Sequence, residues 1–589
     1  MKWKGVKGKI FQTGVFYIYF SLFMSGYLGK YTLPVVTSDL KLAAECGYKI
    51  MEKGGNAVDA AVTTAIAVGA MNAFASGLGG GGFLLVKIPD GKCFEYNFRE
   101  RAPASANANN YKNKEDSSAG RKSIAVPSEL MGLIAVHTDF GILPWEDLFP
   151  EIIKILEDGF LVPRVLAQKL KEFQGKILND RGLYEAYTRN GKILQENDLL
   201  QRRNLARTLK EISRDPSSFF TGEISKSLLE FINSEGTVIL PEELSQQQVT
   251  RKEVFPEIVN KTEIYTTTLP TTGYMLRLAA YILEHIKTTS TPSEELLQSY
   301  LIRIYNELYS IRTELEDLQD EQANTNSLQI HLQNRTVADT LLQSIIGSSP
   351  FSPNKNSVVE DHGTTHINII DKDGMIVALT STINQYWGSG LMDPVTGIIL
   401  NNQIDDFTFS DFATYSGIKL TGSTVNQIKP YKQPLSSAMP SIIKRDNDLY
   451  IIGGSGGIRI PTAIISTVAR IFLCDDPIDK AIDTPRLHYQ GGRTIKVEGK
   501  YTSTLPKMGV NWLVLRDDED TISSCVHIIK YNIKDKSVTA KADRRKDAAV
   551  VGREYLSADR LDSEKKKEFV SFSYRFDFSG NLFKAIMDM

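Results

Sequence analysis

The sequence predicts a layered α/β fold in which helices cover β-sheet. Two observations lead to this prediction. Between residues 130 and 345 the apolar residues mostly follow helical spacing, with polar connectors between the helical stretches. After residue 364 the pattern changes to short β runs, at 367–371, 376–380 and 449–452, separated by turn residues. Sheets and helices bury their apolar faces by packing in layers, so an α/β sandwich is expected.

Two helices are expected near the start of the folded part. Ser38 is a candidate N-cap, and residues 39–53 have the pattern of an amphipathic helix that ends at Gly54-Gly55. Residues 56–71 are rich in Ala and Val, which predicts a helix that is buried on nearly every side and packs against a sheet.

A glycine-rich stretch follows these helices. Its spacing, Gly77-x-Gly79-x-x-Gly82, formally matches the dinucleotide-binding fingerprint. That fingerprint needs a strand before the glycines and a helix after them, whereas here a helix comes first and a strand at 83–87 follows. We therefore interpret the glycines as a tight turn without side chains, which would lie beside a functional cleft.

Further helices are expected at 293–320, where a long charged helix would present a solvated face, and at 461–472. Between 327 and 352 the pattern fades into a polar stretch rich in Ser and Asn, which leads to Asp361. Such a stretch is what a self-cleaving site requires, and it is equally typical of any linker.

Length and composition exclude several classes of protein. The chain has 589 residues, with 42% hydrophobic and 23% charged residues, as in ordinary globular proteins. A net charge of −2 gives no basic surface for nucleic acid. The four cysteines (Cys46, Cys93, Cys474 and Cys525) are far apart and lack metal-ligand or redox spacing, so we expect no metal site, no cofactor and no disulfide framework.

The N-terminus has the pattern of a membrane anchor. Four lysines within residues 1–9 precede a mostly apolar run of 19 residues at 10–28, close to the ~20 that cross a bilayer as a helix. The basic flank would keep residues 1–9 cytoplasmic. We favour an uncleaved signal anchor over a signal peptide cleaved near Ser25-Gly26, and thus a single-pass type II protein whose folded part is lumenal, in a vacuole, or extracellular. The sequons at Asn260 and Asn334 are compatible with this orientation.

The pair Gly363-Thr364 at the start of the β run is typical of a self-cleaving chain. A threonine hydroxyl is a weak nucleophile that needs a neighbouring base. An N-terminal threonine carries one, because its α-amine has a pKa near ~8. Glycine before the cleaved bond leaves room for attack and tolerates strained backbone. On these residues alone, a polar turn before a strand is the simpler interpretation.

Several further motifs, taken in order along the chain, change this balance. They are the glycines of 77–82, Asn97-Phe98-Arg99-Glu100-Arg101-Ala102-Pro103, the polar run 380–390, the stretch 397–407, Pro434-Leu435-Ser436-Ser437 and Gly453-Gly454-Ser455-Gly456-Gly457. With these motifs the chain resembles the γ-glutamyltransferases (γ-glutamyl transpeptidases, glutathione hydrolases) of the N-terminal-nucleophile hydrolases. The resemblance runs from about residue 38 to about residue 552, and it is loose between 161 and 359.

The resemblance implies a four-layer αββα sandwich and a chain that cleaves itself between Gly363 and Thr364. The products would be a large subunit (35–363) and a small catalytic subunit (364–589), which form a heterodimer; residues 552–589 would be an extension of unknown role. The enzyme would take the γ-glutamyl group of glutathione and related compounds onto Thr364, and transfer it to amino acids, dipeptides or water.

The resemblance also implies roles for individual residues. Thr382 would hydrogen-bond the nucleophile, and the backbone N–H groups of Gly456 and Gly457 would bind the oxyanion. Arg99, with its planar fork, suits the α-carboxylate of a γ-glutamyl group. Hydroxyl donors to this carboxylate would come from Ser436 and Ser437, and acceptors for the α-ammonium from Asn384, Gln403 and Asp406. Tyr386 is expected to wall the pocket.

Other interpretations remain open. The chain could be a cephalosporin or glutaryl acylase or a poly-glutamate transpeptidase, although the Arg99, Asp406 and Ser436-Ser437 set favours a free α-amino-acid head group. It could also be an unprocessed, inactive, membrane-anchored homologue. Without the motif, Arg99 would be interpreted as a surface ion pair with Glu100. Arg101 and the run Thr271-Thr272-Gly273 depart from the usual residues of the family.

Overall fold

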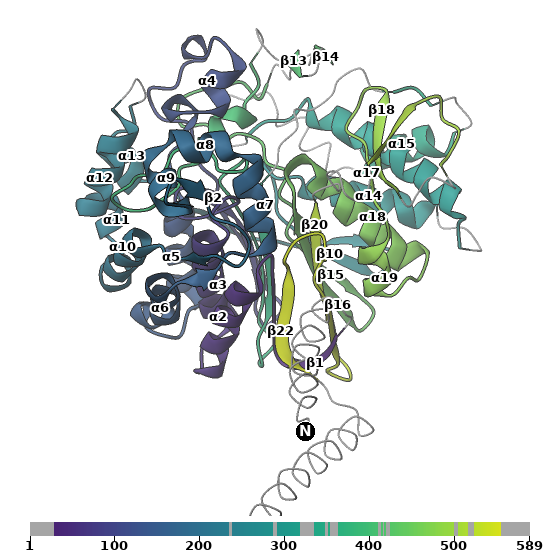
Figure 1. Cartoon of the computed structure of the whole chain (residues 1–589). Helices are drawn as coiled ribbons and strands as arrows, with labels where there is room; N and C mark the ends of the chain where they lie inside the picture. The colour runs from purple at the N-terminus through teal and green to yellow at the C-terminus, as the bar shows by residue number, and fades with distance from the viewer. Residues whose placement is uncertain are drawn as a thin grey trace, which may run out of the picture.

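The computed structural model describes residues 29–234, 238–286, 291–317, 335–347, 351–353, 363–409, 414–415, 418–419, 425–499, 505–515 and 524–554 (Figure 1). The expected anchor at 10–28 and the sequon at Asn334 lie outside these residues. None of the helices within these ranges has the length and apolar character needed to span a membrane.

Thirteen strands form the centre of the molecule. They are β1 (Gly29–Ser38), β2 (Gly81–Lys87), β3 (Cys93–Phe98), β8 (Thr250–Glu253), β9 (Glu257–Val259), β10 (Thr262–Thr266), β11 (Thr365–Ile370), β12 (Ile376–Thr382), β15 (Ser441–Arg445), β16 (Asp448–Ser455), β20 (Cys525–Asn532), β21 (Val538–Lys541) and β22 (Ala549–Glu554). Their hydrogen-bonded order is β8-β3-β2-β12-β11-β1-β21-β20-β16-β15-β10-β9, and β22 also pairs with β1.

This sheet folds onto itself at β1. The register of β1 shifts between Thr32 and Val35, so its first part pairs with β21 and its second part with β11. The two halves face each other across an apolar core, to which Leu85, Ile370 and Ala378 contribute from one half and Ile442, Ile451 and Ile529 from the other. The sheet therefore forms two stacked layers.

Helices cover the outer face of each half, as Figure 1 shows. The β2–β12–β11 half carries α2 (Lys41–Glu52), α3 (Ala57–Met71), α5 (Glu129–Phe140), α6 (Pro150–Asp158), α7 (Arg164–Glu172), α8 (Gln174–Asn179), α9 (Arg181–Tyr187), α10 (Arg203–Arg214), α11 (Ser218–Thr221), α12 (Glu223–Ile232) and α13 (Pro241–Ser245). The β20–β16–β15 half carries α14 (Gly273–His285), α15 (Glu294–Arg312), α17 (Arg335–Ile346), α18 (Ile460–Leu473) and α19 (Ile478–Asp483). The order of layers is helix, sheet, sheet, helix, as expected.

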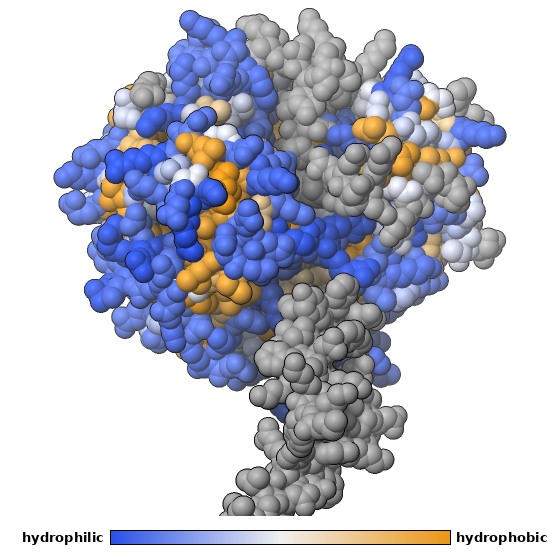
Figure 2. All heavy atoms as spheres, in the orientation of Figure 1, coloured by the Kyte–Doolittle hydropathy of each residue, from blue (hydrophilic) through white to orange (hydrophobic). Residues whose placement is uncertain are grey.

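Smaller elements complete the described chain. They are α4 (Lys114–Ser118), the strand pairs β4–β7 (Phe160–Leu161 with Leu199–Leu200), β5–β6 (Thr188–Arg189 with Lys192–Ile193) and β13–β14 (Thr414–Tyr415 with Ile418–Lys419), and the ladder β17 (Leu487–His488), β18 (Thr494–Glu498) and β19 (Asn511–Leu515). Figure 2 shows a mostly hydrophilic surface on this side, with apolar residues gathered over α8 and α9, where Leu178 and Tyr184 are exposed.

Two expectations about helix ends are wrong. Ser38 is the last residue of β1, and the first helix, α2, begins at Lys41 after Leu40 without a side-chain cap. The helix expected at 293–320 is α15, which ends at Arg312, because residues Leu315 to Asp317 leave the helix to pack beside the 432–433 loop. The buried helix expected at 56–71 is confirmed as α3, all of whose residues are buried.

Candidate active site

Thr364 lies directly before β11, at the end of the sheet where β12 also ends. It is 5% exposed and has a φ of +80°. This left-handed backbone is unfavourable for a β-branched residue and costs on the order of 1–3 kcal/mol, which the surrounding structure must offset. The N–H of Thr364 donates to the Ala75 carbonyl at 3.2 Å, which fixes the residue in this conformation.

The peptide bond before Thr364 is held by hydrogen bonds on both sides. The carbonyl of Gly363 accepts a hydrogen bond from the backbone N–H of Gly456 at 3.0 Å. The Thr364 hydroxyl donates to Oγ1 of Thr382 at 3.2 Å, and this oxygen also accepts from the N–H of Asn384 at 2.8 Å. A carbonyl polarised by an N–H group, next to an oriented hydroxyl, is the arrangement that acyl transfer requires.

Position 363 has no room for a side chain. A Cβ atom there would lie 1.9 Å from the carbonyl oxygen of Asn384. Glycine is therefore needed at this position for close backbone packing, which agrees with the sequence interpretation.

The Gly456-Gly457 pair follows β16 and leads through a short 3₁₀ turn (Gly457–Arg459) into α18. The φ angles of the two residues are +118° and +58°. Both lie in the region that favours glycine. The pair therefore presents backbone N–H groups near the positive end of a helix, where negative charge is stabilised.

The glycine-rich turn before β2 lies against the same site. A Cβ at Gly79 would lie 2.0 Å from the Ile399 carbonyl, and one at Gly80 would lie 2.1 Å from the Thr382 carbonyl. The turn is thus tight and free of side chains, as expected, and it lets the end of β12 approach closely.

A cavity of about 280 Å³ opens beside Thr364. Its walls come from β2 and β12, from the loops that follow β3, β12 and β16, from the segment before β15 and from the start of α18. It is lined by Phe83, Arg99, Thr364, Thr380, Thr382, Asn384, Asp406, Ser436, Ser437, Ala438, Gly457 and Ile460. Eight of the residues singled out from the sequence therefore share one cavity.

At one end of the cavity a buried arginine meets a carboxylate. Nη2 of Arg99 donates to Oδ2 of Asp406 at 2.5 Å and to the Leu435 carbonyl at 2.8 Å. Gln403 does not line the cavity; its amide donates to the same Asp406 oxygen at 2.6 Å and so orients it. Burial raises the pKa of Asp406, and the charge of Arg99 opposes this effect. The arrangement offers a cation for a carboxylate and an anion for an ammonium group.

Further polar groups of the cavity are available to a ligand. Oδ1 of Asn384 is buried and has no hydrogen-bond partner among the described residues, while its amide donates to the Asn402 carbonyl. The backbone of Ser436 and Ser437 is held from behind by Arg312 and by Thr272, one of the residues that depart from the family pattern. The two serines are thus placed by contacts to their carbonyls, and Oγ of Ser436 also accepts from the N–H of Ala438 at 3.1 Å; both residues line the cavity.

A buried charged cluster contacts the backbone of Thr364, and its residues do not line the cavity. The ammonium group of Lys546 donates to the Thr364 carbonyl at 3.1 Å, to Oδ2 of Asp39 at 2.8 Å and to Oγ of Ser455 at 2.6 Å. His527 donates from Nε2 to the other Asp39 oxygen at 2.6 Å. Of these residues, Ser455 stands in the glycine motif 453–457, whereas Asp39, His527 and Lys546 were not expected at the site from the sequence.

Within the part of the chain that the structure describes, Asp39, Cys525 and His527 form one group of three side chains close enough to share a metal ion. Asp39 is already bonded to the Lys546 ammonium and to His527. Burial raises the pKa of the Cys525 thiol well above its ordinary value. A lysine cation at this place opposes the binding of a second cation.

One alternative from the sequence is wrong, and one residue expected at the pocket lies elsewhere. Arg99 and Glu100 do not form a surface ion pair, because both are buried and their closest charged atoms are 3.9 Å apart. Tyr386 is not among the residues that line the described cavity; its ring packs between Phe74 and Phe173, with the Lys169 ammonium 4.2 Å from its centre. His366 is also structural, since its ring bonds to Thr380 and Asn368.

Comparisons with known proteins identify the family of the chain. The family described as Gamma-glutamyltranspeptidase matches residues 43–553. Glutathione hydrolase proenzyme 1 of Schizosaccharomyces pombe is 33% identical over 470 residues, which cover 77% of this chain and 74% of the relative. Scoloptoxin SSD14 of Scolopendra dehaani is 34% identical over 517 residues, which cover 85% and 88%.

The fold is also found among solved structures. The crystal structure of cephalosporin acylase from Bacillus halodurans matches with a TM-score of 0.77 over 90% of this chain and 97% of that one, at 19% identity. At this identity the likeness concerns the fold, which is of the mixed α/β N-terminal-nucleophile hydrolase type. From the match over most of its length, the chain belongs to the gamma-glutamyltranspeptidase family.

Proposed function

We propose that the protein is a self-cleaving γ-glutamyltransferase that acts on glutathione and related γ-glutamyl compounds. The observation that carries this proposal is the hydrogen bond from Gly456 to the carbonyl of Gly363, beside a strained Thr364. This N–H donor on the bond that the sequence marks for cleavage supports the proposal, as does the cavity that Thr364 shares with Arg99 and Asp406.

Self-cleavage begins with attack of the Thr364 hydroxyl on the Gly363 carbonyl carbon. The new oxyanion is stabilised by the Gly456 N–H. The C–N bond then breaks, the nitrogen takes up the proton lost by the hydroxyl, and an ester joins Gly363 to Oγ1. Water hydrolyses this ester and leaves a free carboxylate at Gly363 and a free amine at Thr364. Release of the φ restraint on Thr364 favours the products.

Catalysis reuses the same groups. The α-amine of Thr364 takes the proton of Oγ1, which attacks the γ-carbonyl of the substrate. The N–H groups of Gly456 and Gly457 stabilise the oxyanion, and the leaving amine departs with the proton. The γ-glutamyl ester then reacts with water, which gives glutamate, or with the amine of an amino acid or dipeptide, which gives a new γ-glutamyl compound. Ping-pong kinetics follow from this intermediate.

The polar end of the cavity suits the head group of such a substrate. Arg99 and the Ser436 and Ser437 hydroxyls supply donors for an α-carboxylate. Asp406 and Oδ1 of Asn384, which has no partner within the described ranges, supply acceptors for an α-ammonium. A site with buried acceptors discriminates strongly against an analogue that lacks the matching donor, so these groups favour a γ-glutamyl over a glutaryl substrate.

The experiment compares hydrolysis of γ-glutamyl-p-nitroanilide with that of glutaryl-p-nitroanilide, which lacks only the α-ammonium. We expect kcat/KM to be roughly 10²-fold or more higher for the γ-glutamyl compound, and no hydrolysis by Thr364→Ala. Arg99→Lys keeps the charge but loses the planar fork, so KM for the γ-glutamyl compound should rise roughly 10-fold or more with a smaller change in kcat.

Two outcomes would replace the proposal. Preference for the glutaryl compound would make the chain an acylase. An intact chain that hydrolyses neither compound would make it an inactive homologue.

We also propose that residues 10–28 anchor the protein as a single-pass type II membrane protein, with the folded part lumenal or extracellular. β1 begins at Gly29, and the register Ser38↔Ile367 places Thr364 at the opposite end of this strand, about 30 Å away for ten extended residues. An anchored enzyme would therefore present its cavity away from the membrane. Extraction with alkaline carbonate should leave the full chain in the membrane fraction and release a chain that starts at Gly29; release of both would contradict the anchor.

A further inference from the structure

We propose that Lys546 is a positioning residue for Thr364: its ammonium group holds the Thr364 carbonyl, and its positive charge keeps the freed α-amine neutral and able to accept the proton of Oγ1. This inference rests on the proposed self-cleavage, because the α-amine exists only in the cleaved chain. It adds to that proposal a source for the basicity that the nucleophile needs.

The ammonium group of Lys546 is fixed in place by its hydrogen bonds. Its three N–H donors are used by the Thr364 carbonyl, Asp39 and Ser455, and the side chain is only 6% exposed. Burial by itself would lower the pKa of Lys546, but the charge and hydrogen bond of Asp39, together with Tyr386 and Cys525, outweigh this effect and raise it. Lys546 is therefore a fixed positive charge in contact with the residue that becomes the N-terminus.

The partners of Lys546 are themselves fixed. Asp39 accepts hydrogen bonds from Lys546, Ser455 and Nε2 of His527. Burial would raise the pKa of Asp39, but the charge of Lys546 and the hydrogen bonds from His527 and Lys546 outweigh it and keep this pKa below its ordinary value. Asp39 is thus ionised. It is connected to Thr364 by way of the Lys546 ammonium group, which is hydrogen-bonded to both residues.

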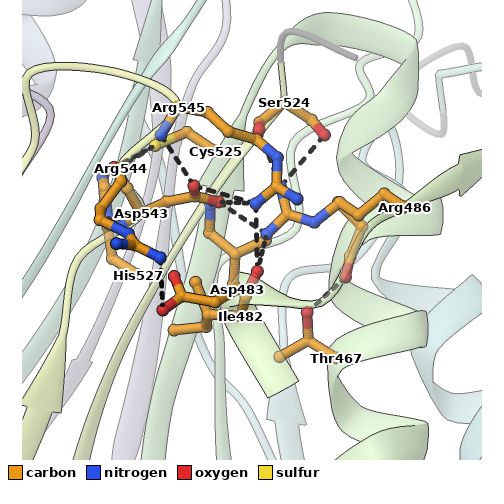
Figure 3. A network of polar contacts seen from close by, with 12 residues as sticks. Thr467, Ile482, Asp483, Arg486, Ser524, Cys525, His527, Asp543, Arg544 and Arg545 are labelled. Carbon is orange, nitrogen blue, oxygen red and sulfur yellow. Dashed lines mark hydrogen bonds and ion pairs between the residues drawn. The ribbon is translucent and has the colours of Figure 1, made fainter. Parts of the chain in front are cut away.

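The chain before Lys546 is held by a second buried network, which Figure 3 shows. Arg486 and Arg545 converge on Asp543, at 2.6 Å and 3.1 Å, and the Asp543 carboxylate also accepts from the N–H of Val526 on β20. Arg545 is further bonded to Glu498. A residue that directly follows such a network has little freedom, so the position of Lys546 is set by the fold and not by Thr364.

The electrostatic effect follows from the order of these contacts. A like charge close to an amine disfavours its protonated form. Lys546 donates directly to the Thr364 carbonyl, whereas the compensating carboxylate of Asp39 contacts Lys546 and, among the described residues, makes no hydrogen bond to Thr364. At a separation of about 5 Å and an effective dielectric constant of about 20, a unit charge alone shifts a pKa by about two units, and the opposite charge of Asp39 reduces this shift. An N-terminal amine with an ordinary pKa near ~8 would then be mostly neutral at pH 7.

Other groups around Thr364 contribute less to this balance. Burial lowers the pKa of His366 to about 3, so its ring is neutral. The Cys525 thiol is also neutral, since burial raises its pKa well above the ordinary value. The ionisable groups around Thr364 and the Lys546 ammonium group come from several elements. They are Asp39, His366, Tyr386, Cys525 and His527, and at the cavity Arg99 and Asp406.

The first test is the pH dependence of kcat for hydrolysis of γ-glutamyl-p-nitroanilide by the cleaved protein. We expect Lys546→Met to move the acid limb of the profile upward by about one pH unit or more, so that activity falls about 10-fold at pH 7 and largely recovers near pH 9.5. Lys546→Arg keeps the charge and should keep the limb within a few tenths of a unit.

The matched control is Lys541→Met, which removes another buried lysine, one that is bonded to Asp483 and does not contact Thr364. The acid limb of this variant should not move. An unchanged limb in Lys546→Met, with kcat lowered equally at every pH, would overturn the proposal.

A second measurement uses the unchanged protein and so does not depend on how the variants fold. Carbamylation of the Thr364 amine by cyanate, followed by mass spectrometry over a range of pH, reports the pKa of this amine directly. We expect a value clearly below ~8, and a value of ~8 or above would overturn the inference. If the chain cleaves itself but does not hydrolyse the γ-glutamyl compound, the proposed substrate is wrong, and this titration still decides the role of Lys546. If the chain never cleaves, both proposals are overturned.

Discussion

Glu100 shows how a single residue can couple this site to pH. It directly follows Arg99 in the chain, and it is completely buried, with both carboxylate oxygens lacking a hydrogen-bond partner within the described part of the chain. Burial raises the pKa of Glu100 to about 7, although Arg99 opposes this effect. The neighbouring Glu129 is buried as well, and burial raises its pKa well above the ordinary value. Near neutral pH, the segment that carries Arg99 is therefore close to a protonation change.

The consequence for stability has a definite sign. Because the folded protein holds a proton on Glu100 up to about pH 7 and the unfolded chain loses it near pH ~4.3, this residue stabilises the fold at low pH and loses that contribution as pH rises between these values. Between pH 5 and 7.5, the free energy of unfolding should fall further in the unchanged protein than in Glu100→Gln. We expect the two decreases to differ by up to about 3 kcal/mol. Denaturant unfolding at the two pH values checks this, and parallel losses in both proteins would contradict it.

The sequence predicted residues of the site far better than their partners. Short sequence motifs were enough to identify several residues that the structure brings to one cavity, namely Arg99, Thr382, Asp406 and Gly457. Lys546 stands in a run of three basic residues at 544–546, which is typical of a solvated surface. Its burial depends on Asp39, more than 500 positions away, so no local pattern could reveal it.

At the scale of elements, α3 and the glycine-rich turn after it determine where Thr364 lies. The chain leaves α3 at Asn72 and reaches Ala75, whose carbonyl accepts hydrogen bonds from Thr364 and Ile383. The Ala- and Val-rich composition was enough to predict a helix buried on all sides. The strand order could not be predicted in the same way, because pairing depends on contacts between segments that are hundreds of residues apart.

The N-terminus of α3 offers a test of this role. Oδ1 of Asn56 accepts from the N–H groups of Val58 and Asp59, and the Asp59 carboxylate accepts from the N–H of Asn56, which forms a capping box. We expect Asn56→Ala to lower the free energy of unfolding by about 1–2 kcal/mol. Denaturant titration checks this, with the exposed Asn109→Ala as a control that should change stability by less than ~0.5 kcal/mol. Equal stability of the two variants would contradict the capping role.

At the scale of the whole molecule, the two expected fragments are interleaved in one sheet. Residues before Gly363 supply β1, β2, β3, β8, β9 and β10, and residues after Thr364 supply the other strands. The pairs β2–β12, β1–β11, β1–β21, β1–β22 and β10–β15 all join one fragment to the other. Cleavage at Gly363 therefore breaks none of the contacts that hold the layers together.

This interleaving predicts a stable heterodimer. After cleavage, both fragments should elute together in size-exclusion chromatography at the size of the intact 65.7 kDa chain, and should separate only in denaturant. The uncleaved Thr364→Ala chain is the reference for the elution volume. Separation of the fragments in native buffer would contradict the account of the fold.

The measurement that tests the central claim most directly is the mass and N-terminal sequence of the small fragment, taken from the purified protein. The account predicts a fragment that begins Thr364-Thr365-His366, is present in the unchanged protein and in Thr364→Ser, and is absent in Thr364→Ala. A single intact chain, or a fragment with another N-terminus, would contradict the assignment of Thr364 as the nucleophile.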